Sequence, residues 1–221
     1  MIVQERMAVY INSLDTGNGP FLEALERQAL LDEVPIIRQD MQSFLKVLLA
    51  IHQPKKILEV GTAVGFSALL MADHTSEECH ITTIEKYEKR IPVAKENFKK
   101  AGREERITLL EGDALEIMAG LNESYDMIFM DAAKGQYIHF LPDALRLLRT
   151  GGVLISDNVL QDGDIIESHY AVERRNRTIH KRMREYLYVL KHTDGLQTSI
   201  VPVGDGAAVT VKQKDTIILH L

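Results

Sequence analysis

Residues Ile57-Leu-Glu-Val-Gly61-Thr-Ala-Val-Gly65 decide the fold of this chain, because they join a buried strand to a glycine turn. The turn leads directly into Phe66-Ser-Ala-Leu-Leu-Met-Ala72, which has the composition of a helix packed inside a core. In an open α/β sheet, such a strand–turn–helix unit makes a nucleotide pocket beyond the carboxyl ends of the strands. The sequence therefore predicts a pocket at this edge of a sheet.

Short apolar runs alternate with amphipathic segments along the chain, which predicts a mostly parallel sheet with helices on both faces. The predicted strands are 57–60, 81–84, 107–110, 127–130 and 153–156, and the helices between them are 66–73, 87–100, 115–121 and 136–148. Two helical pieces within 21–51 precede the sheet, a longer helix is expected at about 167–190, and the strands 198–203 and 207–212 predict a hairpin. The expected class is α/β, doubly wound and Rossmann-like, with extra N-terminal helices and a C-terminal antiparallel hairpin.

Composition limits the classes of protein that fit. The chain has 221 residues, 45% hydrophobic and 26% charged, with a net charge of −6. We expect one domain over 1–221, with N-terminal helices to about 52 and the core over about 53–214. The only cysteine, Cys79, excludes an internal disulfide, and there is neither a secretory leader nor an apolar run of about 18 residues, so we expect a cytoplasmic protein without a membrane span.

The predicted pocket fits an adenosine without phosphates. Gly61 and Gly65 do not complete the Gly-x-Gly-x-x-Gly pattern that holds a pyrophosphate. Glu85, at the end of the second strand, suits the two hydroxyls of a ribose, and Asp113-Ala114 after the third strand could meet an adenine edge. As an ordered set these residues favour S-adenosylmethionine over NAD, although each one alone is equally typical of a turn or a surface carboxylate.

Oxygen-bearing side chains follow the next two predicted strands. Asp131 ends one strand with Lys134 three residues on, and Asp157-Asn158 ends the next. Two carboxylates and an amide are ligands for a hard divalent cation such as Mg²⁺, and no His/Cys set has zinc spacing. The alternative, that Asp157-Asn158 only caps the following segment, has about even odds for that pair in isolation.

At this point the chain resembles the cation-dependent, S-adenosylmethionine-dependent class I O-methyltransferases, which include catechol and caffeoyl-CoA O-methyltransferases. The resemblance extends in family order and spacing over most of the chain. The matching residues are Leu58-Glu-Val-Gly61 through Gly65-Phe-Ser67, Glu85, Gly112-Asp-Ala114, Met130-Asp131-Ala-Ala-Lys134, Asp157-Asn158 and Val201-Pro-Val-Gly-Asp-Gly206.

The resemblance implies roles for individual residues. Lys134 and Asp131 would be catalytic, with Lys134 accepting the acceptor's proton or steadying the developing oxyanion, two roles that both remain open. The metal would be held by Asp131, Asp157 and Asn158. The cofactor would be held by Ile37, Glu59, Gly61, Ser67, Glu85, Asp113, Ala114 and Asp131.

A metal bound in this way requires two adjacent oxygens on the acceptor, as in a catechol or in 5-hydroxyuridine. The segment 174–184 carries six Arg or Lys residues and no acid, and a stripe of Arg174, Arg177, Lys181 and Arg184 could follow RNA phosphates. A solvated helix face is the usual alternative. This segment and Val34-Pro-Ile-Ile-Arg38 resemble the bacterial branch that methylates 5-hydroxyuridine at the tRNA wobble position, and the chain has no Trp for a catechol lid.

We therefore expect a Mg²⁺-dependent enzyme that converts tRNA 5-hydroxyuridine to 5-methoxyuridine in the anticodon loop, a single-stranded target. One rival is a small-molecule O-methyltransferase acting on catechols or hydroxycinnamoyl esters such as caffeoyl-CoA. The other is an RNA-binding protein that keeps the fold without turnover. By family analogy, the apolar N-terminal helices favour a homodimer.

Overall fold

The structure is a computed structural model that describes residues 4–168 and 170–219. The described residues form two compact units, 4–117 and 118–219. The expectation of one domain over 1–221 stays a prediction.

The first unit contains three parallel strands in the order β3-β2-β1. Val60 of β1 lies opposite Ile84 of β2, and Glu85 of β2 lies opposite Glu111 of β3, so all three strands end at the same edge. The elements of this unit are α1 (Glu5–Ser13), α2 (Pro20–Leu31), α3 (Gln39–His52), β1 (Lys56–Val60), α4 (Phe66–Asp73), β2 (His80–Glu85), α5 (Ile91–Lys100), β3 (Ile107–Glu111) and most of α6 (Ala114–Gly120).

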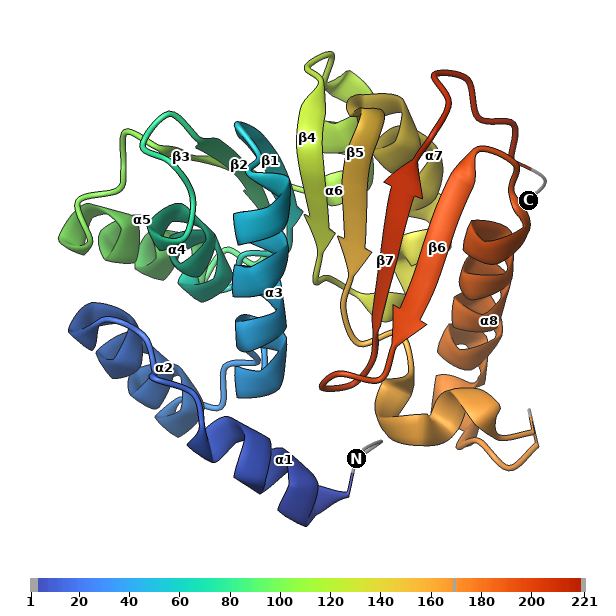
Figure 1. The fold of residues 1–221 in the computed structure, drawn as a ribbon, viewed down its shortest axis with the longest axis horizontal. Helices are drawn as coiled ribbons and strands as arrows, with labels where there is room; N and C mark the ends of the chain where they lie inside the picture. The colour runs from blue at the N-terminus through green and yellow to red at the C-terminus, as the bar shows by residue number, and fades with distance from the viewer. Residues whose placement is uncertain (1–3, 169, 220–221) are drawn as a thin grey trace. The chain divides into compact units, whose positions relative to one another are not determined.

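The deciding stretch forms the core of this unit. Four of the five β1 residues are buried, and so is every α4 residue from Phe66 to Ala72. A helix that is apolar on all sides must be covered all round, and α2 and α3 both contact α4 (Figure 1). Met41, Leu45 and Leu49 form the buried stripe of α3 at the predicted helical spacing.

The second unit contains four strands in the order β4-β5-β7-β6, which lie side by side in Figure 1. The β4–β5 pair is parallel, whereas β7 runs antiparallel to both β5 and β6. α7 contacts β4 and β5, while α8 contacts β6 and α7. The elements are β4 (Tyr125–Met130), η1 (Lys134–Gln136), α7 (Tyr137–Leu147), β5 (Leu148–Ser156), η2 (Gln161–Ile166), η3 (Arg174–Asn176), α8 (Arg177–His192), β6 (Leu196–Val201) and β7 (Ala207–Lys212).

The predicted class is confirmed: the protein is α/β, with parallel central strands and an antiparallel C-terminal pair. The hairpin strand β6 ends at Val201 rather than at 203, because Pro202 has no N–H to donate to a ladder. Helix α5 begins at Ile91 rather than at 87, with Pro92 in its first turn, where no N–H is needed. No helix among the described residues has the length and apolar character needed to cross a membrane.

The long helix predicted at about 167–190 is wrong over its first ten residues. Residues 174–176 form the short 3-10 turn η3, and α8 begins only at Arg177. Glu173 has an extended backbone (φ −50°, ψ 136°), and Val172 is the only buried residue among those described between 167 and 176, so no apolar stripe holds a helix there. The predicted stripe is therefore broken, because Arg174 does not lie on α8.

Candidate active site

The loop between β1 and α4 is held in an uncommon backbone conformation. Gly61 and Gly65 have φ values of 98° and 88°, and Ala63 has a φ of 48°. The N–H of Ala63 donates to Oε2 of Glu85 at 2.8 Å, and the N–H of Gly65 donates to the carbonyl of Thr62 at 2.7 Å. A non-glycine residue at positive φ persists only when surrounding contacts fix it, so Glu85 shapes this loop from the neighbouring strand.

Glu85 is also placed to bind a hydroxyl. Its carboxylate, 9% exposed, accepts N–H donors from Ala63, Lys86 and Tyr87 at 2.8–2.9 Å. A carboxylate has about four acceptor sites, so one of them is left for a ligand hydroxyl. The predicted ribose contact of Glu85 stays a prediction, and this geometry leaves an acceptor site for one of the two hydroxyls.

Glu59 and Ser67, both predicted to bind the cofactor, contact each other. Glu59 is fully buried and accepts hydrogen bonds from Ser67 Oγ and Thr83 Oγ1, each at 2.5 Å. Burial raises the pKa of Glu59, and the two hydroxyl donors partly oppose that rise. Glu59 thus ties β1, β2 and α4 together, and the geometry favours a supporting role for it through Ser67.

Two α5 residues that the sequence did not single out support the same loop. Asn97, 9% exposed, donates from Nδ2 to the carbonyl of Val64 at 2.8 Å. A Cβ added at Gly65 would lie 2.5 Å from the ring of Phe98. An amide within the apolar stripe of Ile91, Ala94 and Phe98 is the signal that would have identified Asn97.

We predict that Gly65→Ala lowers the free energy of unfolding by roughly 2–4 kcal/mol, because it adds a collision with Phe98 to the strain of positive φ. Gly102→Ala is the matched control, since Gly102 has a φ of 63° and nothing within 4 Å of the added Cβ. Urea unfolding of both variants measures the difference. Equal losses in the two variants would mean that the contact with Phe98 is unimportant.

The other predicted adenosine residues lie at the start of α6 and before α3. Asp113 caps α6 by accepting the N–H of Leu115 at 3.0 Å, and Ala114 is buried beside it. Ile37 is 3% exposed, and its carbonyl accepts a hydrogen bond from Gln42 at 3.0 Å.

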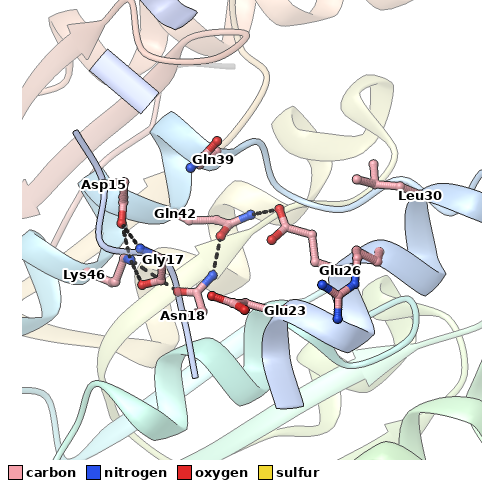
Figure 2. Close-up of a pocket in the computed structure, with 10 residues that line it drawn as sticks. Asp15, Gly17, Asn18, Glu23, Glu26, Leu30, Gln39, Gln42 and Lys46 are labelled. Atoms are coloured by element: carbon pink, nitrogen blue, oxygen red, sulfur yellow. Dashed lines mark hydrogen bonds and ion pairs between the residues drawn. The ribbon is translucent and has the colours of Figure 1, made fainter. Parts of the chain in front are cut away.

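A cavity of about 300 Å³ lies against the N-terminal helices, and none of the predicted site residues lines it. Gln42 is central to its wall: its amide oxygen accepts from Asn18, and its amide nitrogen donates to Glu26, both at 2.8 Å (Figure 2). Lys46 lies 3.2 Å from Asn18 Oδ1 and 3.4 Å from Asp15. Because Gln42 also bonds to the carbonyl of Ile37, this network fixes the backbone at Ile37.

The second unit brings the predicted metal ligands to two neighbouring strand ends. Met130 of β4 pairs with Ser156 of β5, so Asp131 and Asp157 follow directly at adjacent ends. Asp157 is 2% exposed, and its Oδ1 accepts the N–H of Asn158 at 2.7 Å. Burial, followed by the charge of Asp131, raises the pKa of Asp157 to about 7.

Two buried tyrosines form the floor beneath these acids. The hydroxyl of Tyr137 donates towards the carbonyls of Met130 and Asp157, at 3.0 and 3.1 Å, which ties the two strand ends together. Tyr186 of α8 packs edge-on against Tyr137, with ring centroids 5.6 Å apart, and shares a hydrogen bond with Ser156. Burial raises the pKa of both phenols, so they stay neutral.

Asp205 is a further acid of this site, and its role was not predicted from the sequence. It lies in the turn between β6 and β7 and is 6% exposed. Its Oδ2 accepts Nδ2 of Asn158 at 3.4 Å, while its carbonyl accepts the N–H of Leu160 at 2.8 Å. The amide nitrogen of Asn158 faces Asp205, so the amide oxygen of Asn158 is turned away from that carboxylate. The backbone of Asn158 has a φ of 57°.

The donor set fits a hard divalent cation. Two carboxylates and an amide carbonyl are offered by Asp131, Asp157 and Asn158. Burial and the charge of Asp131 disfavour the ionised form of Asp157, and a nearby cation would stabilise that form. Within the described ranges, no three His, Cys, Asp or Glu side chains form a group that could hold a metal. The amide of Asn158 would therefore be the third protein ligand.

We predict that, in chelator, the wild-type free energy of unfolding falls as pH rises from about 4 to about 7. Asp157 is protonated over this range in the folded protein but ionised in the unfolded chain, so the folded state binds more protons. Asp157→Asn should therefore be more stable than wild type at pH 8, by on the order of a few kcal/mol, with the gap closing towards pH 4. Urea unfolding at both pH values measures the gap, and a gap independent of pH would contradict the assignment.

Two of the four predicted RNA residues hold the segment that follows Asn158. Arg184 donates to the carbonyl of Ile165 at 3.2 Å, and Arg177 donates to the carbonyls of Val172 and Tyr170, each at 3.2 Å. Lys181 is exposed and lies 3.6 Å from Glu185. Arg177 and Arg184 thus hold the loop, whereas Arg174 and Lys181 face solvent.

Arg182, which the predicted stripe omitted, connects α8 to the lysine loop. Its Nη1 donates to the carbonyl of Gly135 at 3.1 Å, directly after Lys134. Ile179 lies against Gly135 as well, at 3.4 Å from the position of an added Cβ. The basic helix therefore packs against the segment that carries the predicted catalytic lysine.

Known proteins resemble the chain over both units. A family model described as O-methyltransferase matches residues 15–213. The catechol O-methyltransferase of Mycobacterium tuberculosis is 31% identical, over 71% of this chain and 73% of that protein. The crystal structure of a provisionally named caffeoyl-CoA O-methyltransferase from Staphylococcus aureus is 32% identical, with a TM-score of 0.84 over 94% of this chain and 98% of that one.

An SAH-bound methyltransferase from Podospora anserina is 25% identical, with a TM-score of 0.84 and coverage of 95% of each chain. The family model extends from before α2 to just after β7, so it includes both the glycine loop and the paired strand-end acids. This chain belongs to the O-methyltransferase family.

Proposed function

We propose that this O-methyltransferase takes its methyl group from S-adenosylmethionine and delivers it to the 5-hydroxyl of 5-hydroxyuridine in the tRNA anticodon loop, giving 5-methoxyuridine. The observation that carries the RNA part is the position of α8. Lys181 of this helix and Arg174 of the preceding turn η3 face solvent, and Arg182 of the helix holds the backbone next to Lys134.

The cofactor part rests on the first unit and on one relative. The glycine loop has no phosphate-binding pattern, Glu85 keeps an acceptor site for a hydroxyl, and the related Podospora anserina enzyme was solved with SAH bound. Glu85 would bind the ribose, Asp113 and Ala114 would meet the adenine edge, and Ile37 would lie near the methionine end.

The chemistry needs an activated acceptor hydroxyl. A divalent cation held by Asp131, Asp157 and Asn158 would lower the pKa of that hydroxyl and fix its direction. Tyr137 keeps the two acids at a fixed spacing, and Asp205 orients the amide of Asn158. Lys134 takes the hydroxyl proton or stabilises the oxyanion that forms as the methyl group is transferred.

A small-molecule acceptor is the second candidate. It is favoured by the names of the relatives, which include catechol and caffeoyl-CoA O-methyltransferases. A catechol and 5-hydroxyuridine both present two adjacent oxygens, so the ligand set cannot separate them. The exposed cations Arg174 and Lys181 favour RNA over a neutral catechol, because cations bind phosphates. Caffeoyl-CoA also carries phosphates, so only the comparison of acceptors tests it against RNA.

The deciding experiment compares acceptors with the same purified protein. Hypomodified tRNA bearing 5-hydroxyuridine, catechol and caffeoyl-CoA are each supplied with S-adenosylmethionine and Mg²⁺, and products are identified by mass spectrometry. We expect 5-methoxyuridine with a kcat/KM at least about 100-fold above that for either small molecule. Methylation of catechol without any 5-methoxyuridine would transfer the assignment to the second candidate.

We predict that Arg174→Glu with Lys181→Glu raises the KM for tRNA by about tenfold or more and flattens its salt dependence. The matched control is Lys55→Glu with Lys100→Glu, which reverses two surface cations on the first unit that belong to exposed ion pairs. Initial rates at several salt concentrations measure the effect. A KM equal to that of the control would show that the basic face is only a solvated surface.

We also propose a homodimer formed through α1, which has no buried residue. Its apolar side chains Met7, Val9, Tyr10 and Ile11 are about half or more exposed. Analytical ultracentrifugation tests this assembly.

A further inference from the structure

Tyr170 is an exposed aromatic residue within the loop that joins η2 to η3. Its relative exposure is 84%, and Ile166, the last residue of η2, is 82% exposed. Burial of an aromatic side chain is strongly favourable, so this open ring offers contact area to a partner.

Arg177 contacts both the backbone and the ring of Tyr170. Its Nη2 donates to the carbonyl of Tyr170, and its Nε donates to the carbonyl of Val172, both at 3.2 Å. The same guanidinium lies 6.0 Å from the centroid of the Tyr170 ring. The ring is therefore backed by a cation and fixed through its own backbone.

The charges around Tyr170 fit a polyanion better than an apolar partner. Arg174 and Lys181 are exposed, and Arg175 is also exposed, at 2.7 Å from Glu173. The six cations of 174–184 exceed by one the five acids of 162–185, which are Asp162, Asp164, Glu167, Glu173 and Glu185. Cations interleaved with an open aromatic ring form the surface that binds unpaired nucleotides, because each base offers a face for stacking.

The loop is continuous with the site of the acids. The segment that contains this loop begins after the metal-ligand candidate Asn158, and the N–H of Leu160 in it donates to the carbonyl of Asp205. Arg184 then fixes Ile165, and Arg182 returns to Gly135 beside Lys134. This segment therefore links the acids to Tyr170, and we expect the nucleotides next to the target base to lie along it.

We propose that the ring of Tyr170, backed by Arg177, stacks on an unpaired base next to the target nucleotide of the RNA. This inference rests on the proposed function and adds to it the residue that recognises the single-stranded character of the loop. The stacked base contributes affinity without a sequence requirement, because stacking uses the face that all bases share.

The test uses the full-length protein and an anticodon stem–loop RNA, with affinity measured by fluorescence anisotropy and turnover by mass spectrometry. Tyr170→Ala should raise Kd and KM for this RNA by about 5- to 100-fold, whereas Tyr170→Phe keeps the ring and should stay within about threefold of wild type. Tyr188→Ala is the matched control, since Tyr188 is 64% exposed on α8 and stacks on His192 instead.

An abasic scan of the RNA loop then identifies the contact. With wild type, removal of one base beside the target should weaken binding as much as Tyr170→Ala does, and with Tyr170→Ala that removal should have no further effect. Equal methylation of tRNA by wild type and Tyr170→Ala, or additive losses at every abasic position, would overturn this inference alone. No methylation of tRNA by the wild type would overturn the proposed function and this inference with it.

Discussion

Asp131→Ala and Asp157→Ala should each reduce kcat by about 10³-fold, because either change removes a carboxylate from the proposed cation site. Chelator should do the same to the wild type, and added Mg²⁺ should restore it. Direct binding of Mn²⁺, followed by electron paramagnetic resonance, should be lost in both variants. This readout does not depend on turnover, so it separates loss of the cation from damage to some other step.

Asp194→Ala is the control for removal of a carboxylate from the second unit. Asp194 is exposed and pairs with Lys214, which holds the pKa of its carboxyl below the usual value. The control should keep wild-type turnover and Mn²⁺ binding. Undiminished turnover in chelator, or in the double variant of Asp131 and Asp157, would disprove metal-assisted transfer and remove the reason for an acceptor with two adjacent oxygens.

The sequence predicted the residues at the strand ends well, because parallel strands bring whatever follows them to one edge. Asp131 and Asp157 could be placed together from strand order alone, and the register of Met130 with Ser156 confirms it. Glu85 was found in the same way, at the end of β2. These positions depend only on backbone periodicity, which apolar runs report directly.

Residues that act from helices and turns were harder to find. Asn97 and Arg182 each contact a loop carbonyl far away in sequence, and a lone polar residue in an amphipathic helix does not show which carbonyl it will reach. The sequence assigns no role to Asp205, because the closeness of the β6–β7 turn to Asn158 is set by tertiary packing. The prediction of a helix at 167–190 was wrong in its first part for a different reason. The charged residues had helical spacing, but residues 167–176 have no apolar stripe that could pack a helix against the core.

Lys134→Met should lower kcat by about 10²- to 10⁴-fold, with little change in the dissociation constant of S-adenosylmethionine, because the lysine acts on the acceptor oxygen. Lys134 begins η1 at the tip of the β4 segment, and its charge lowers the pKa of Asp157, so the two side chains interact within one unit. Steady-state kinetics with isothermal titration of the cofactor measures both quantities.

Lys134→Arg distinguishes the two roles that remain open for this lysine. An arginine keeps the positive charge but does not release a proton near neutral pH. If electrostatic stabilisation dominates, the arginine variant should keep much more activity than the methionine variant. If proton acceptance dominates, both variants should be equally impaired, and kcat of Lys134→Met should recover at high pH as solvent hydroxide replaces the base. A kcat for Lys134→Met within about threefold of wild type would exclude both roles and leave the activation of the acceptor hydroxyl to the strand-end acids and their cation.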